Sequence, residues 1–131
     1  MSEENVEVVK AVFVAWKERD RDAALALMDP DIDVDVAGWT AILGYTGRGR
    51  EALGRTVDGW LESWTSLEFF PRHFIDAGDQ VIVWLTMEGR GRESGVPTEM
   101  GGAAVYTVRN GRVSAIHGFN TLAEAAAAAG I

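Results

Sequence analysis

Residues 104–119 read AVYTVRNGRVSAIHGF. Two apolar, partly β-branched runs flank Asn110-Gly111, the dipeptide most typical of a two-residue β-hairpin turn. A second turn signal, Asp76-Ala77-Gly78-Asp79, lies upstream between two further apolar runs. The second half of the chain therefore predicts an antiparallel meander of strands. Their expected ranges are residues 67–75, 80–92, 98–109 and 112–119.

The first half of the chain follows the helical period instead. Apolar residues recur at spacings of three and four over residues 5–18, and again over residues 50–64, which predicts two amphipathic helices. A shorter helix fits residues 22–28. Residues 31–36 alternate aspartate with β-branched residues, which is the pattern of a strand with one polar face.

An Ala-rich helix over residues 121–129 is expected to close the chain, because Thr121 and Glu124 have the spacing of a capping box. The predicted order places helices before a mostly antiparallel sheet, which indicates an α+β fold. A chain of 131 residues suits one compact unit. We therefore expect a single domain over residues 1–131.

The composition excludes several kinds of partner and chemistry. The chain has 12 Lys and Arg residues against 20 Asp and Glu residues, for a net charge of −8. Nucleic acid and anionic membrane surfaces are not expected partners, because like charges repel. The sequence has no cysteine, which excludes disulfides and thiolate catalysis. No secretory signal or membrane-spanning run is visible, so a cytoplasmic location is expected.

Several short pieces of the sequence, in their order and spacing, resemble one superfamily. They include Glu4-Asn5-Val6-Glu7, Asp29-Pro30-Asp31, Gly49-Arg50-Glu51-Ala52-Leu53, Ile75-Asp76-Ala77-Gly78-Asp79-Gln80-Val81 and Tyr106-Thr107-Val108-Arg109-Asn110-Gly111-Arg112-Val113. The chain resembles the nuclear transport factor 2-like superfamily, and within it the SnoaL-like polyketide cyclase and ketosteroid isomerase branch. The resemblance implies a cone-shaped barrel, in which a curved, mostly antiparallel sheet wraps around three N-terminal helices, with a short C-terminal helix. It also implies an apolar pocket at the wide end and a homodimer that pairs sheet to sheet.

Two titratable residues are candidate catalytic groups. By the resemblance, Asp35 matches the general-base aspartate of ketosteroid isomerases, which moves protons next to a carbonyl. His117 is expected to face the pocket from the last strand, on the same side as Val113 and Phe119, where it would form a proton-transfer dyad with Asp35. The alternatives are a solvated strand face that carries Asp35 and a histidine that makes one structural hydrogen bond.

The resemblance also argues against ketosteroid isomerase activity itself. That activity stabilises an enolate with a tyrosine and a protonated aspartic acid. The corresponding positions fall on Val12 and Ala103, so both donors are missing, and each such loss costs about 10²–10³-fold in rate. No metal or other cofactor is expected, because no cluster of His and carboxylate residues has metal-ligand spacing.

Large rings and small residues define the expected ligand-binding wall. Rings that line a hollow can stack on flat ligands, and the small-residue segment Gly101-Gly102-Ala103-Ala104 leaves volume in its strand. Ordinary core packing is the alternative for each ring. The predicted ligand-binding residues are Phe13, Trp16, Trp39, Trp60, Trp64, Trp84, Ala103, Val105 and Phe119.

These expectations lead to functions from two classes. One is a protein that binds a small apolar molecule and acts as a cofactor-independent isomerase, cyclase or hydratase by acid–base chemistry. The other is a non-catalytic ligand-binding or dimerisation module. A homodimer through the sheet is expected because residues 81–85 are apolar on both faces. Tyr106 and Val108 are expected on the side that the helices leave uncovered.

Overall fold

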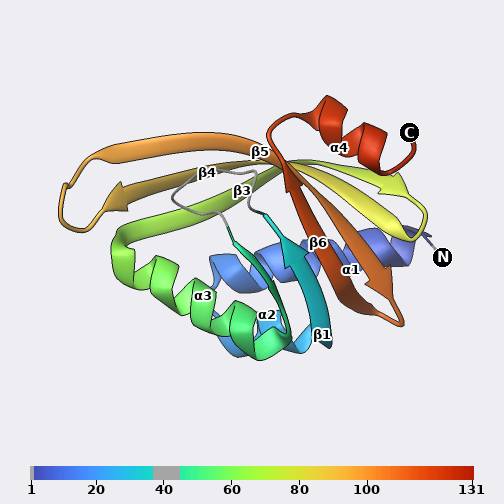
Figure 1. Ribbon diagram of the computed structural model, residues 1–131, viewed down its shortest axis with the longest axis horizontal. Coiled ribbons are helices and arrows are strands. Elements are labelled where there is room, and N and C mark those ends of the chain that lie inside the picture. The colour runs from blue at the N-terminus through green and yellow to red at the C-terminus, as the bar shows by residue number, and fades with distance from the viewer. Residues whose placement is uncertain (1, 37–44) are drawn as a thin grey trace.

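The computed structural model describes residues 2–36 and 45–131. Its elements are α1 (Ser2–Lys17), α2 (Arg21–Ala26), β1 (Met28–Asp35), β2 (Thr46–Arg48), α3 (Arg50–Ser63), β3 (Trp64–Ala77), β4 (Gln80–Gly91), β5 (Pro97–Arg109), β6 (Arg112–Phe119) and α4 (Leu122–Ala128). Within these residues the strands form one sheet in the order β2-β1-β6-β5-β4-β3. The β1·β6 pairing is parallel and the others are antiparallel. The predicted α+β fold is confirmed (Figure 1).

The meander forms as the turn signals predict. Asn110 and Gly111 have φ angles of 52° and 76°, the combination of positive φ that a type I′ hairpin turn requires. At the hairpin before it, the Asp76 carboxylate accepts a hydrogen bond of 3.0 Å from the backbone N–H of Gly78. Local turn chemistry thus sets the connections between β3, β4, β5 and β6.

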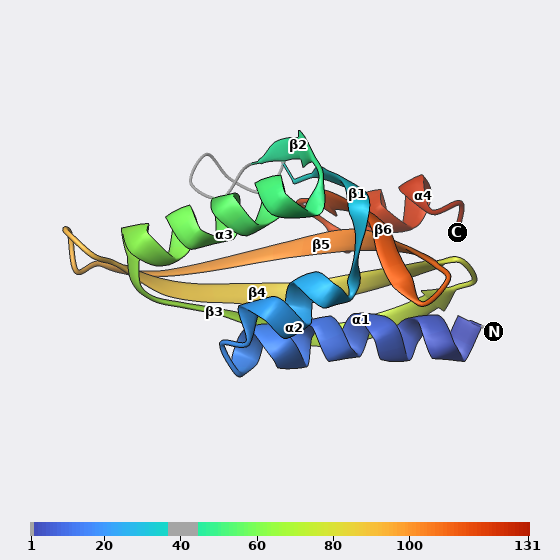
Figure 2. The ribbon, with the colours of Figure 1, turned by 90° about the horizontal axis from the view of Figure 1, so that it is seen from below.

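Helices α1 and α3 cover one face of the sheet, which we call the inner face. α1 packs along β3, and α3 packs against β1 and β3 (Figure 2). Buried apolar residues alternate along the strands toward this face, as Ile32 and Val34 do in β1. The main core of the molecule therefore lies between the inner face and these helices. No helix in the described part of the chain is long and apolar enough to cross a bilayer.

Helix α4 packs on the opposite, outer face of the sheet, against β5 and β6. In Figure 1 α4 lies at the top of the view, whereas α2 and α3 lie at the bottom. Ile82, Ala103, Val105 and Ala125 form a second buried cluster there. The expectation that helices cover only one face is wrong, because the chain crosses to the outer face after β6 and caps a helix with Thr121, whose hydroxyl accepts from the Glu124 N–H at 3.1 Å.

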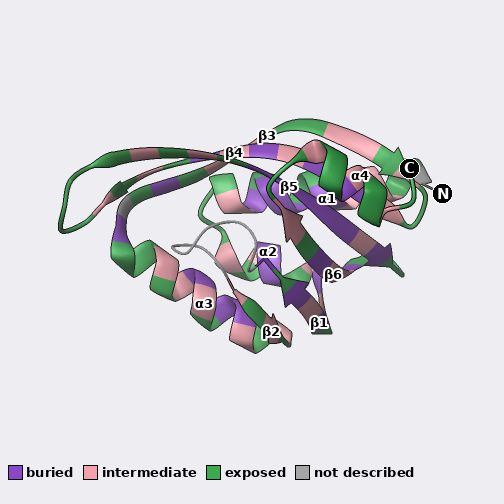
Figure 3. Ribbon diagram, turned by 45° about the horizontal axis from the view of Figure 1, so that its top comes forward, coloured by how far each residue is buried: buried purple, intermediate pink, exposed green. Residues whose placement is uncertain are grey.

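The apolar run of β4 is consequently buried on both sides within one chain. Val81, Val83 and Leu85 are buried in the main core, while Ile82 is buried under α4. Tyr106 and Val108 also lie in the main core, so their predicted place on an uncovered face is wrong. Figure 3 shows burial concentrated where helices overlie the sheet. The patch from which the homodimer was inferred is thus buried, and the homodimer stays a prediction.

Candidate functional site

An apolar hollow lies between α1, α3 and the inner face of the sheet. Its outer part, which we call the outer groove, has a volume of about 480 Å³. Its inner part, the inner cavity, has a volume of about 60 Å³. The two parts adjoin each other, because five side chains line both. These shared side chains are Phe13, Trp16, Val57, Trp60 and Phe69.

Aromatic rings from four elements, α1, α3, β3 and β5, build the wall. Phe13 and Trp16 project from α1 at a spacing of three residues, which places them on one face of the helix. The ring of Phe13 meets Phe74 of β3 edge-on at 6.0 Å between centroids, and meets Tyr106 of β5 at 5.8 Å. Such contacts hold each ring at a fixed angle. The rings therefore form a preorganised apolar surface.

Tyr106 is one of the side chains that line the inner cavity. Among the described side chains that line this cavity, Tyr106 is the one with an ionisable group. Burial raises the pKa of its phenol well above the usual range, so the hydroxyl keeps its proton at all physiological pH values. The residue is 5% exposed, and its hydroxyl makes no hydrogen bond to the described residues. It is available as a donor to an oxygen of a bound molecule.

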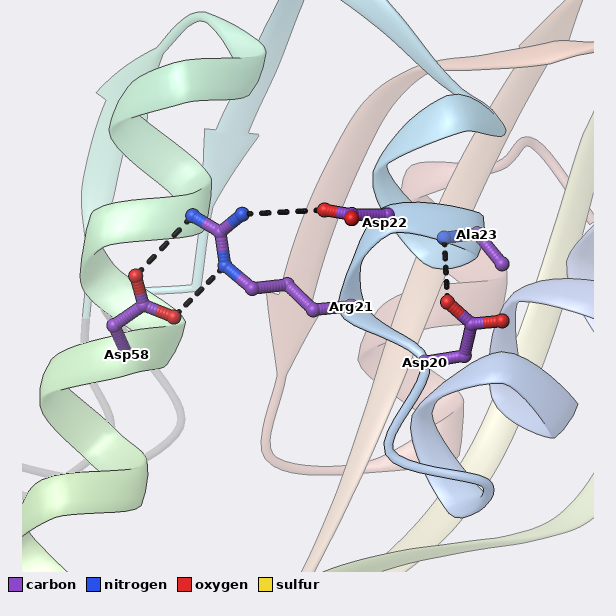
Figure 4. Close-up of polar contacts among 5 residues, drawn as sticks. All are labelled: Asp20, Arg21, Asp22, Ala23 and Asp58. Atoms are coloured by element: carbon purple, nitrogen blue, oxygen red, sulfur yellow. Dashed lines mark hydrogen bonds and ion pairs between the residues drawn. The ribbon is translucent and has the colours of Figure 1, made fainter.

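An ion pair stands beside the outer groove and ties α2 to α3 (Figure 4). The Arg21 guanidinium donates from Nε to Asp58 Oδ1 at 2.8 Å and from Nη2 to Asp58 Oδ2 at 3.2 Å. Asp22 lies at 3.7 Å from Nη1. A Cβ at Gly54 would lie 2.5 Å from Arg21 Nη2. The glycine in α3 therefore makes room for the bidentate pair.

The predicted ligand-binding residues divide between the two faces of the sheet. Phe13, Trp16 and Trp60 line the hollow. Trp64 is buried beside Gly89, away from the hollow. Trp39 lies outside the described residues. Whether any of them contacts a ligand stays a prediction.

The remaining four predicted wall residues lie on the outer face, so their expected place in the pocket is wrong. Trp84, Ala103, Val105 and Phe119 pack with the cluster under α4. The reason is the two-residue repeat of the strand. In β5, Ala104 and Tyr106 point to the inner face, so Ala103 and Val105 must point outward. Of the small residues expected to enlarge the pocket, Ala103 instead packs in the cluster under α4.

A β-bulge in β6 explains why His117 also lies on the outer face. Val108 pairs with Val113, but Thr107 pairs with Ala115, so Ser114 is the extra residue. One added residue reverses the alternation beyond it. Val113 and Ile116 therefore both face inward, and His117 is exposed. Its predicted place on the pocket face is wrong.

Asp35 and His117 are nevertheless neighbours. They are register partners in the parallel β1·β6 pair, and both are exposed. The Asp35 carboxylate accepts a hydrogen bond of 3.4 Å from the hydroxyl of Thr46. The sheet thus brings the two candidate catalytic groups together, but among the described residues neither lines the hollow. Their catalytic role stays a prediction.

Sequence reasoning missed Phe69, Phe74 and Tyr106 as wall residues. Leu67 and Phe69 share the two-residue repeat of β3, which could have placed Phe69 beside the core. A bulge between Pro71 and His73 then shifts the register, so that Phe74 also reaches the hollow. Within the described residues, no three His, Asp or Glu side chains gather in a way that could hold a metal ion.

A curved sheet with helices on its inner face around an apolar hollow defines a class of protein, the NTF2-like fold. Solved NTF2-like structures superpose on nearly the whole chain. The chain belongs to the SnoaL-like domain family, whose sequence model matches residues 9–116. The resemblance read from the sequence is thereby confirmed.

Three solved structures illustrate the similarity. An NTF2-like protein from Burkholderia thailandensis E264 has a TM-score of 0.78 at 26% identity, with 96% of each chain covered. A candidate polyketide cyclase from Xanthomonas campestris pv. campestris has a TM-score of 0.74 at 21% identity, with 93% of each chain covered. RV0760c from Mycobacterium tuberculosis, in complex with estradiol-17beta-hemisuccinate, has a TM-score of 0.77 at 20% identity, covering 92% of this chain and 95% of that one. No curated protein matches the chain.

Proposed function

We propose that this protein binds a small, flat, largely apolar molecule in the hollow between α1, α3 and the sheet. The observation that carries the proposal is an aromatic-lined hollow of two adjoining parts, the inner one lined also by Tyr106, whose hydroxyl makes no hydrogen bond to the described residues. The outer groove, at about 480 Å³, falls within the range of roughly 300–1,000 Å³ typical of small-molecule sites. The rings would stack on the ligand, and Tyr106 would donate to one of its oxygens.

Structural neighbours support this kind of ligand. RV0760c was solved with a steroid derivative, estradiol-17beta-hemisuccinate, and another neighbour is described as a candidate polyketide cyclase. A steroid and a polyketide ring system are both flat and largely apolar. The identities of 20% and 21% support a class of ligand and no particular compound.

Filling the hollow tests the proposal. Val57 lines both parts of the hollow, so Val57→Phe adds a ring where the ligand would lie. Val96→Phe is the matched control, because Val96 is 57% exposed in the β4–β5 connection. The probe is phenylnaphthylamine, a neutral aromatic dye that fluoresces in apolar sites. We expect saturable binding to the wild type and to Val96→Phe, and at least tenfold weaker binding to Val57→Phe.

Thermal unfolding of both variants provides the folding control, since overpacking costs about 1–3 kcal/mol. Equal dye affinity in the folded Val57→Phe variant and the wild type would show that the dye binds elsewhere. Absence of saturable binding to the wild type would overturn the proposal.

Catalysis is the second candidate function, and the protonated Tyr106 favours it. A phenol in an apolar site can stabilise negative charge that develops on a substrate oxygen, as an isomerisation, cyclisation or hydration requires. Asp35 and His117 are the candidate acid–base pair, acting without a cofactor, and from the outer face they would act on a molecule bound there and not on one in the hollow. The non-catalytic alternative is a ligand-binding or dimerisation module. Mass spectrometry of a polyketide or steroid incubated with the protein distinguishes the two alternatives. An enzyme would convert the molecule, whereas a non-catalytic module would leave it unchanged.

A homodimer and a cytoplasmic location belong to the same proposal. The sheet-to-sheet homodimer would use the part of the outer face that α4 leaves open, near the half-buried Trp84. Light scattering tests the homodimer, which is expected at twice the chain mass of 14.2 kDa. A single 14.2 kDa species at micromolar concentration would exclude it. Cell fractionation tests the location.

A further inference from the structure

The charge around the outer groove is opposite to the charge of the whole chain. The chain carries a net charge of −8, with 12 Lys and Arg residues. Five of those 12 cationic residues line the outer groove, against a single acidic residue, Glu68. The five are Lys10, Lys17, Arg19, Arg21 and Arg72. An acidic protein that gathers its cations at one opening creates a local positive potential there.

Three of these cations have no carboxylate partner among the described residues. Arg21 is held by Asp58, and Lys10 lies 3.8 Å from Glu7. Lys17 and Arg19 form no ion pair and no side-chain hydrogen bond with the described part of the chain. Arg72 donates to the Thr86 hydroxyl at 3.1 Å and lies over the Phe70 ring at 5.3 Å, so its charge is not neutralised.

Arg19 occupies a backbone position that disfavours an arginine. Helix α1 ends in a Schellman motif, in which Arg19 N–H donates to Trp16 C=O (3.1 Å) and Asp20 N–H donates to Ala15 C=O (2.9 Å). Arg19 has φ = 60°, the left-handed conformation that glycine adopts without steric cost. The residue that would best stabilise this turn is glycine. An arginine in this conformation costs stability, and its side chain lines the outer groove.

The charge of Arg19 would have a role in binding if the proposed ligand carried an anionic group. The two exposed apolar side chains Val14 (52% exposed) and Leu61 (37% exposed) line the same groove as the cations. The groove is therefore apolar on its sides and cationic at its rim. That combination fits a molecule with an apolar body and an anionic end.

We propose that the hollow selects amphipathic anions, with the aromatic body of the ligand in the hollow and its carboxylate or comparable anionic group at Lys17, Arg19 and Arg72. The inference rests on the proposed function and adds the substrate class. A guanidinium matches a carboxylate with paired hydrogen bonds. Lys17, Arg19 and Arg72 are exposed, so salt weakens their attraction for the anion. Glu68 lines the same groove and opposes an anion, but five cationic residues outnumber it there.

A pair of dyes that differ in one anionic group tests this inference. Anilinonaphthalene sulfonate carries the charge, and phenylnaphthylamine is its neutral counterpart. The variants are Arg19→Gly, Lys17→Gln and Arg72→Gln, with Arg109→Gln as the control, since Arg109 is exposed at the distant β5–β6 hairpin. We expect each of these three rim variants to bind the sulfonate dye about tenfold more weakly than the wild type does, which corresponds to the loss of one charge-assisted contact. The affinity for the neutral dye should stay within twofold.

The melting temperature and the sulfonate affinity of Arg19→Gly are expected to change in opposite directions, which would not happen if Arg19 had only a structural role. Relief of the left-handed conformation should raise its melting temperature by about 4 °C, while its affinity for the sulfonate dye falls. Arg19→Lys keeps the charge and should retain most of that affinity. A stabilised variant with weaker anion binding separates the two effects and excludes misfolding as the cause.

The outcomes separate the two proposals. If the wild type binds neither dye, the proposed function fails and the inference fails with it. If both dyes bind to the wild type, the inference alone is overturned by either of two results. One is that the rim variants bind the sulfonate dye as tightly as the wild type does, and the other is that they lose affinity for both dyes equally. The sulfonate affinity of the wild type should also fall several-fold when salt is raised from 50 mM to 500 mM, by screening of the rim charges.

Discussion

The inner and outer faces of the β1·β6 pair differ although the same strands build both. Val34 and Ile116 point inward and line the inner cavity. Their chain neighbours Asp35 and His117 point outward and are exposed. The inner face gathers apolar side chains around a hollow, and the outer face carries the titratable groups. The side chains on one face of these two strands therefore do not indicate which chemical groups lie on the other face.

This contrast narrows the chemistry that the hollow can perform. The inner cavity meets one ionisable group in the described chain, Tyr106, and the charged residues stand at the rim of the outer groove. A ligand would therefore be held by stacking and by end-on polar contacts.

Ile116 and His117 are adjacent residues with opposite burial, so truncating each gives the most direct comparison. Ile116→Ala should lower the free energy of unfolding by about 2–4 kcal/mol, because it removes buried apolar volume. His117→Ala should change it by less than about 0.5 kcal/mol. Urea denaturation measures both. Similar losses in the two variants would contradict the assignment of faces that the bulge at Ser114 produces.

Tyr106 should make stability depend on pH in the alkaline range. Burial raises its pKa above the usual value of 10.0, so the unfolded chain loses this proton near pH 10 while the folded chain keeps it. The free energy of unfolding contributed by Tyr106 therefore falls as pH rises above 10, by about 1.4 kcal/mol at pH 11. Tyr106→Phe removes this dependence. Parallel pH profiles of the wild type and Tyr106→Phe would contradict it.

The Arg21–Asp58 pair stands where the inner face opens. The side chains of Arg21 and Asp58 are 39% and 47% exposed, so solvent screens the pair. Asp58→Ala should cost about 0.5–1 kcal/mol of unfolding free energy. Asp22→Ala is the control, because Asp22 is 97% exposed and lies 3.7 Å from the guanidinium, and it should have no measurable effect. Equal effects of the two variants would mean that the bidentate geometry contributes nothing.

Asp35→Asn should have the smallest effect. Among the described residues Asp35 lines no part of the hollow, so its loss of charge should leave the affinity for phenylnaphthylamine within twofold and the stability within about 0.5 kcal/mol. Fluorescence titration measures the affinity. A tenfold change in affinity would indicate that the Asp35–His117 pair contacts the ligand. It would then favour the predicted dyad.

Local signals in the sequence predict most of the fold. The Asn110-Gly111 turn, the Thr121 cap and the alternation of residues 31–36 each depend on a few neighbouring residues, and each element forms where these signals place it. Strand β2 was not predicted, because three residues in a Gly-rich connection carry too little periodic pattern.

The site was predicted less well, because it depends on which face each side chain reaches. One extra residue at Ser114 reverses the face of His117, and a bulge carries no strong local signal. The face of the sheet on which α4 packs also depends on nonlocal contacts. Ala103 and Val105 pack against α4 on the outer face, although the sequence predicted them in the pocket. The helical rings Phe13, Trp16 and Trp60 were placed correctly beside the hollow because a helix keeps its period without such interruptions.

The parallel pairing of β1 with β6 has a consequence for how the chain folds. Asp35 and His117 are paired across about 80 residues, and contacts of such long range form slowly because a large loop must close first. During synthesis β1 leaves the ribosome long before β6, so the edge of β1 that pairs with β6 stays open until the last strand emerges. Peptides that pair with an open strand edge should therefore bind the nascent chain and lose that binding once β6 has paired with β1.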